Sequence, residues 1–199
     1  MSKKLNELVK IYIKSCRAGI NEELKYWAEA SNLSTAIKKA TLSRLGNNKK
    51  HRHQSRIREK HLRRAASVLL ARREDIFAAP TFESLSEIIG ATFQPGNGIG
   101  ELAVYDFAIR IGAFLKLQPN EVHLHRGTRD GARMLDFHDE HTIPLKHLPR
   151  PLQQLSPIEI EDFLCVFRDC LGPQQLKGPV TKAFLGSMRA CCDRSSTGC

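Results

Sequence analysis

A short turn that contains two glycines, Gly98-Ile99-Gly100, directly precedes an apolar helical pattern that begins at Glu101. Glycine allows tight backbone geometry and lets a ligand approach the main chain closely. The free N–H groups at the start of a helix, together with the helix dipole, suit a phosphate. The sequence therefore predicts a phosphate-binding turn, in which Ile99 points inward and joins the flanking helices. The alternative is an ordinary helix–helix turn, and the negative charge of Glu101 counts against a phosphate.

A concentrated positive charge lies upstream of this turn. The formal net charge of the chain is +10, and residues 38–73 contain thirteen Lys or Arg residues and one acidic residue, Glu59. This segment therefore carries +12, and the rest of the chain sums to about −2. A concentrated basic field attracts polyanions, of which nucleic acid is the commonest. The alternative is a solvated helix face or a basic tail.

The predicted contacts with nucleic acid in this segment are its exposed cations, namely Lys49, Lys50, Arg52, Arg56, Arg58, Arg63 and Arg64. The segment lacks aromatic residues, so base stacking on single strands is not supported. Binding to the backbone of a duplex fits better, although phosphate contacts alone do not distinguish DNA from RNA. A second small cluster, with Arg126 and Arg129 beside Gly127 and Gly131, would form the other wall of a positive groove.

The run from Gly98 to Asp106 (GIGELAVYD) resembles the hairpin and second helix of the helix-hairpin-helix DNA glycosylases, and the resemblance covers about residues 82–125. It implies an all-α fold, duplex DNA as the ligand, and hairpin amides that hold a phosphate. The bifunctional members have a catalytic lysine two residues after the second hairpin glycine. That position is Leu102 here, so Schiff-base chemistry through a lysine is not expected.

The resemblance also assigns a candidate catalytic carboxylate. Glu121, in Glu121-Val122-His123, corresponds to the aspartate that acts at the sugar in that family. A carboxylate at this position would stabilise an oxocarbenium-like sugar or orient a water molecule. A monofunctional base-excision glycosylase that uses Glu121 is therefore one hypothesis. The alternative is that Glu121 is a first-turn residue favoured by a helix dipole.

The remaining polar residues that could carry out chemistry are interpreted as structural and not as parts of a functional site. Asp106 and Arg110 have the i,i+4 spacing of an ion pair on a helix surface, and Tyr105 is expected in the core. The histidines of the C-terminal half do not match a familiar zinc spacing. We therefore expect no metal and no cofactor, and we interpret the following histidines as residues of polar segments: His123, His125, His138, His141 and His147.

The elements that must position these residues are predicted to be helices. Apolar residues recur at helical spacing over 5–19, 21–28, 34–45, 57–73, 81–89, 101–117 and 156–171, and the polar stretch 49–56 is predicted to be an exposed arm. Ser156 and Glu159 form a capping-box signature with Pro157 at the first helical position. Residues 136–151 are predicted to be a loop. No alternating strand pattern is present, so the predicted fold class is all-α, a helical bundle with a helix-hairpin-helix element.

The predicted organisation is a helical N-terminal region over 1–48, a core with the basic arm over 49–175, and a partly flexible tail over 176–199. No apolar run approaches the ~20 residues of a membrane span. The N-terminus lacks a secretory pattern. The six cysteines form no CxxC pair, which favours reduced thiols. We expect a cytoplasmic protein that is nucleoid-associated if it binds DNA.

These observations lead to three hypotheses. The first is a DNA-binding protein of the helix-hairpin-helix glycosylase type, without catalysis, whose place would be in DNA repair. The second is the glycosylase that uses Glu121. The third is a helical interaction protein whose basic face binds an acidic partner. Salt-dependent binding of duplex DNA separates the first two from the third.

Overall fold

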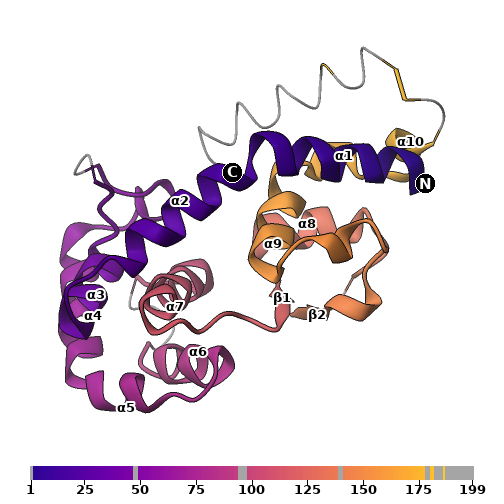
Figure 1. Cartoon of the computed structure of the whole chain (residues 1–199). Helices are drawn as coiled ribbons and strands as arrows, with labels where there is room; N and C mark the ends of the chain where they lie inside the picture. The colour runs from indigo at the N-terminus through magenta and orange to yellow at the C-terminus, as the bar shows by residue number, and fades with distance from the viewer. Residues whose placement is uncertain are drawn as a thin grey trace. The chain divides into compact units, whose positions relative to one another are not determined.

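The computed structural model describes residues 2–46, 49–93, 98–138, 141–177, 180–181 and 186. The described residues form ten α-helices and two short β-strands, which confirms the all-α fold class (Figure 1). The helices are α1 (Ser2–Ser15), α2 (Arg17–Ala28), α3 (Leu33–Leu42), α4 (Glu59–Ala71), α5 (Arg73–Ala78), α6 (Phe82–Gly90), α7 (Glu101–Leu115), α8 (Arg126–Arg133), α9 (Pro157–Val166) and α10 (Pro173–Leu176).

The chain divides into two compact units that do not follow the three consecutive segments expected from the sequence. The central unit comprises residues 22–118, and the terminal unit comprises residues 1–21 together with 119–199. A unit built from both ends of the chain depends on contacts that are distant in sequence, and hydrophobic periodicity does not report such contacts. Most of the predicted tail, including 178–179, 182–185 and 187–199, lies outside the described residues.

The central unit contains α3 to α7 and its core lies where these helices face one another. α3 packs against α4 and α7, and α6 packs against α7. The apolar residues of α4 recur at i, i+3, i+4 and i+7, namely Leu62, Ala65, Ala66 and Leu69, and all four are buried. This spacing places them on one face of the helix and leaves the charged residues on the other.

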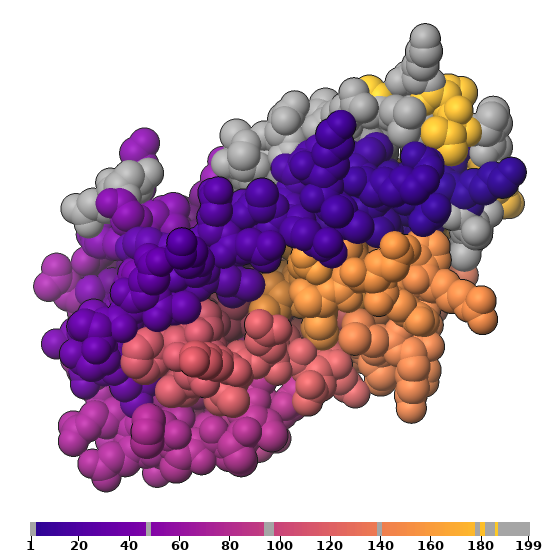
Figure 2. All heavy atoms as spheres, viewed as in Figure 1, coloured from indigo at the N-terminus to yellow at the C-terminus, as the bar shows by residue number. Residues whose placement is uncertain are grey.

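The terminal unit joins the first helix of the chain to its C-terminal third. Tyr12 of α1 packs edge-to-face on Phe163 of α9, with ring centroids 5.7 Å apart. α1 also contacts α10, and in Figure 2 the indigo N-terminal residues lie beside yellow residues of the C-terminal segment. Lys4 Nζ donates to the carbonyl of Gln175 at 2.8 Å. The strands β1 (Glu121–His123) and β2 (Thr142–Pro144) pair antiparallel, and Val122 lies opposite Ile143.

Side chains cap the N-terminal ends of several helices. The Ser156 side chain accepts from the Glu159 amide, and the Glu159 carboxylate accepts from the Ser156 amide, which confirms the capping box with Pro157 at the first turn. Thr81 and Ser84 form a second capping box at α6, and Asn32 caps α3. These side chains satisfy backbone N–H groups that have no partner within the helix.

Several expectations are wrong. The predicted helix over 57–73 ends at Ala71, and α5 begins at Arg73. The predicted loop over 136–151 contains β2, because Ile143 has a cross-strand partner that periodicity cannot reveal. Cys16 and Cys165 each take part in a disulfide, so the expectation of reduced thiols does not hold for these two. The spacing of cysteines along the chain does not by itself indicate a disulfide.

Candidate functional site

The glycine turn lies at the start of α7 and packs against α4. Gly98 has φ +75°, and a Cβ placed on it would lie 2.9 Å from Nδ1 of His61. Gly100 is the N-cap of α7, has no side-chain cap and has open space where a Cβ would stand. Ile99 between them is only 9% exposed, as the sequence predicts. Residues 94–97, the first part of the predicted turn, lie outside the described residues.

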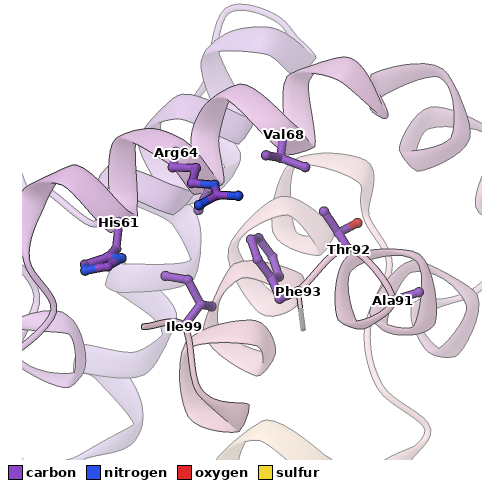
Figure 3. A pocket seen from close by; sticks show the side chains of 8 residues that line it. His61, Arg64, Val68, Ala91, Thr92, Phe93 and Ile99 are labelled. Atoms are coloured by element: carbon purple, nitrogen blue, oxygen red, sulfur yellow. The ribbon is translucent and has the colours of Figure 1, made fainter. Parts of the chain in front are cut away.

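A cavity of about 340 Å³ lies beside the turn, and Figure 3 shows its side chains. His61, Arg64, Ala65 and Val68 of α4 form one side; Ala91, Thr92 and Phe93 after α6, together with Ile99, form the other. The lining is about equally polar and apolar, and Arg64 supplies the positive charge. The cavity therefore brings one predicted nucleic-acid contact, Arg64, next to another, Ile99.

The other predicted cations of the central unit occupy different positions. Arg58 precedes α4 and is exposed, and Arg63 is 74% exposed at its side chain and 3.4 Å from Glu59. Arg52 and Arg56 are exposed beside the short 3₁₀ helix η1 (Arg52–Gln54). Lys49 is exposed as well, whereas Lys50 is half-buried and donates to the carbonyl of Ile57 at 2.9 Å.

The remaining predicted site residues belong to the terminal unit. Arg126 and Arg129 lie in α8, and Arg129 Nη2 lies 3.4 Å from His141 Nδ1. Glu121 lies in β1, opposite Pro144, and is half-buried. None of these residues belongs to the unit that holds the glycine turn. A catalytic role for Glu121 and a second wall from Arg126 and Arg129 therefore stay predictions.

Asp106 and Arg110 form an ion pair inside the central unit, so the expectation of a surface pair is wrong. Both residues are buried, and Arg110 Nη2 lies 3.6 Å from Asp106 Oδ2. Arg110 also donates to Ser43 Oγ at 2.7 Å and to Gln54 Oε1 at 3.0 Å. The i,i+4 pairing is present as predicted, but α7 is covered on this side by α3 and η1.

The predicted basic arm closes over this pair. Gln54 is fully buried and its amide donates to Asp106 Oδ2, and His53 Nδ1 lies 3.0 Å from the same oxygen. Because His53 and Gln54 face inward, the interpretation of 49–56 as a wholly exposed arm is wrong. Arg52 and Arg56 are exposed to solvent. One side of the segment 49–56 therefore contacts Asp106, and the other side carries exposed positive charge.

A second carboxylate lies at the edge of the same cluster. Glu23 Oε1 accepts from Trp27 Nε1 at 3.0 Å and lies 3.4 Å from His51 Nε2. The guanidinium of Arg110 stacks over the Trp27 ring, 4.7 Å from its centroid. The rings of His51 and His53 meet edge-to-face at 4.7 Å. We call His51, His53, Asp106, Arg110 and Glu23 the buried polar cluster.

The electrostatics of the cluster follow from its charges. Burial by itself raises the pKa of Asp106, but the Arg110 charge and hydrogen bonds from His53 and Gln54 outweigh burial and lower the pKa to about 2. Burial also opposes the charged form of His53, but its hydrogen bond and attraction to Asp106 raise its pKa. For Glu23, the bonds to His51 and Trp27 and the Arg110 charge overcome burial and lower the pKa to about 2. Both carboxylates are therefore ionised at neutral pH.

Sequence reasoning singled out neither His51 nor His53 as functional. Their neighbours are all polar or basic, which indicated a solvated segment. One signal was present in α7, where Asp106 and Arg110 stand among apolar residues on every side. A helix that is apolar all round is buried, so charged residues within it need partners from other segments.

The histidines considered as metal ligands from the sequence are spread over the terminal unit. His123 is half-buried in β1, and His125 is buried at the start of α8, with Nε2 3.0 Å from Glu161. His138, His141 and His147 are exposed. Among the described residues, the group of side chains with metal-ligating atoms close together is His51, His53 and Asp106.

Within the described part of the chain, no helix has the length and apolarity to cross a membrane. Comparison with known proteins found no matching family model, no similar curated protein and no similar solved structure.

Proposed function

We propose that the chain binds double-stranded nucleic acid, DNA in the first instance, through the exposed face of α4 and the glycine turn before α7. The supporting observation is that Arg64 and Ile99 line one cavity while His61 lies against Gly98. Arg64 of the basic segment therefore lies beside the turn that leads into α7. Phosphate oxygens are bound by both kinds of group.

The charge of the exposed residues supports a ligand with many phosphates. Among the described residues, no ion pair engages Arg52, Arg56, Arg58, Lys60 or Arg64, all of which are exposed. Each such cation that neutralises a phosphate releases counterions, and affinity then falls steeply with salt. Since the basic segment itself contains no Phe, Tyr or Trp, the proposed contacts are with the duplex backbone and carry little sequence preference.

The test is binding of a fluorescent DNA duplex, measured by anisotropy at several salt concentrations. We expect the double variant Arg63→Glu/Arg64→Glu to bind more weakly and with a flatter salt dependence, by about one unit of slope for each phosphate that is no longer neutralised. The matched control is Arg133→Glu/Arg168→Glu, which makes the same charge change at two exposed arginines of the terminal unit.

Three outcomes are informative. Equal weakening in both double variants would mean that net charge, and not this surface, governs binding. Failure of the unaltered protein to bind duplex at low salt would overturn the proposal and leave the acidic protein partner as the surviving hypothesis. Parallel titration with an RNA duplex separates RNA from DNA as the preferred ligand.

A further inference from the structure

We propose that His51, His53 and Asp106 bind a divalent transition-metal ion of the Zn²⁺ class. One ring nitrogen of each histidine and one carboxylate oxygen of Asp106 all lie within 4.8 Å of one another. Ligand atoms around a single Zn²⁺ stand about 2 Å from the ion and hence only a few ångströms apart. The inference concerns a site distinct from the phosphate-binding surface.

The donor set determines the kind of ion. Two imidazoles and a carboxylate suit Zn²⁺ and its transition-metal neighbours, whereas Mg²⁺ and Ca²⁺ prefer oxygen ligands throughout. Glu23 Oε1 lies 3.4 Å from His51 Nε2 and so adjoins one of the three ligands. The three side chains therefore match the protein ligands of zinc sites in which water takes the fourth position.

The two oxygens of Asp106 have different partners. Gln54 and Arg110 both approach Oδ2, and His53 Nδ1 lies 3.0 Å from Oδ2 and 3.3 Å from Oδ1. Of these three partners only His53 contacts Oδ1, so Oδ1 is the oxygen that a metal ion could approach without displacing Gln54 or Arg110. Gln54 and Arg110 would then hold the carboxylate by its other oxygen, which is how outer-shell residues orient a metal ligand.

The charge balance favours a cation. Two carboxylates, Asp106 and Glu23, lie in the cluster with one guanidinium, Arg110, so carboxylates outnumber the permanent cation. An uncompensated charge in a buried site is unfavourable, and a bound cation offsets it. The site is also accessible, because the side chain of His53 is 27% exposed.

The experiment uses the full chain after removal of metals with EDTA and subsequent removal of the EDTA. Trp27 is the one tryptophan of the sequence, and its indole donates to Glu23, so its fluorescence reports on the cluster. We expect Zn²⁺ to bind one equivalent per chain with a saturating change in Trp27 emission. Mg²⁺ at the same concentration should leave the emission unchanged.

The variants locate the site. His51→Ala/His53→Ala should lower the Zn²⁺ affinity by more than about tenfold, since even removal of an outer-shell partner lowers affinity by that factor. The matched control is His138→Ala/His147→Ala, which removes two exposed histidines of the terminal unit and should bind Zn²⁺ unchanged. Circular dichroism establishes that both variants are folded.

Equal Zn²⁺ affinity in the two double variants would overturn the proposal. If the His51/His53 variant does not fold, the Co²⁺ spectrum of the unaltered protein decides. Visible ligand-field bands without a thiolate charge-transfer band support imidazole and carboxylate ligands. Absence of the visible bands at equimolar Co²⁺, or a thiolate band that assigns the ion to cysteines, contradicts the site.

Discussion

At the level of single residues, the central unit depends on a charged pair that is almost completely buried. Arg110 is 3% exposed and is held by Ser43, Gln54 and Asp106, with Trp27 stacked on its guanidinium. Removing two charges from water is unfavourable, and their attraction offsets this only when the remaining hydrogen-bonding groups are satisfied. The intact ion pair is therefore compatible with a stable fold, whereas removal of either residue alone leaves a buried charge without its partner and destabilises the protein.

Arg110→Met should destabilise the protein by about 3–5 kcal/mol, because it leaves the Asp106 carboxylate buried without its cationic partner. The free energy of unfolding is measured by urea titration. Arg63→Met is the control, since the Arg63 side chain is 74% exposed and a surface change of this kind stays within about 0.5 kcal/mol. Similar stability in both variants would show that the buried pair contributes nothing.

The glycine turn provides a second prediction about single residues. Gly98→Ala should lower the stability by about 1–2 kcal/mol, because φ is positive there and the added Cβ would meet His61. Gly100→Ala should change it little, since Gly100 has extended backbone and open space. Thermal unfolding of the two variants compares them directly. An unchanged melting temperature for Gly98→Ala would mean that the turn does not require a glycine.

Among the elements of the terminal unit, α8 and α9 pack closely against each other. A Cβ on Gly131 would lie 2.1 Å from the backbone carbonyl oxygen of Leu164, so the two helices approach at this position only because a side chain is missing. Gly127, one turn earlier in α8, has a wider space, with Cys165 Sγ at 3.4 Å. Gly131 is therefore required for the close approach of α8 and α9, whereas Gly127 is not.

Gly131→Ala should destabilise the protein by about 1–3 kcal/mol, the usual effect of overpacking, because the neighbouring atom is backbone and cannot rotate away. Gly127→Ala should be neutral or should stabilise α8 by up to about 1 kcal/mol through helix propensity. Denaturant unfolding followed by circular dichroism measures both. If the two substitutions have the same effect, α8 does not pack against α9 in the way described.

For the molecule as a whole, acid stability depends on how many carboxylates titrate at a lower pH when folded than when unfolded. Asp106, faced by His53, Gln54 and Arg110, and Glu23, faced by His51, Trp27 and Arg110, both have a folded pKa of about 2. The unfolded chain therefore binds protons first as the pH falls. Stability from these groups is complete above about pH 5 and is lost toward pH 2.

We expect a steep loss of unfolding free energy between about pH 5 and pH 2 in the metal-free protein, measured by urea titration with EDTA present. Asp106→Asn should be less stable at neutral pH and should lose less on acidification, because the substituted residue does not titrate. The raised pKa of His53 acts in the opposite direction, so that its contribution is lost as the pH rises through the folded pKa. If the unfolding free energy of Asp106→Asn falls with pH as steeply as that of the unaltered protein, Asp106 does not contribute to the acid sensitivity.

The fold class and much of the local structure could be predicted from the order of the residues alone. Helical periodicity placed the buried faces of α1 and α4, and the Ser156–Glu159 capping box is present as predicted. The inward position of Ile99 and the exposure of Arg63 and Arg64 also followed from the pattern of neighbouring residues. These features depend on residues within one or two helical turns, which a sequence displays directly.

Which residues meet across the chain could be learned only from the folded molecule. Asp106 and His53 are separated by 53 positions, and no periodicity connects them. No periodicity in the sequence connects Arg64 with Ile99, which line one cavity. In the terminal unit, Arg17 pairs with Glu159 at 2.5 Å, and these two residues are also far apart in the sequence. Burial turned a predicted surface pair into the centre of the buried polar cluster, because burial depends on what covers a helix and not on the helix itself.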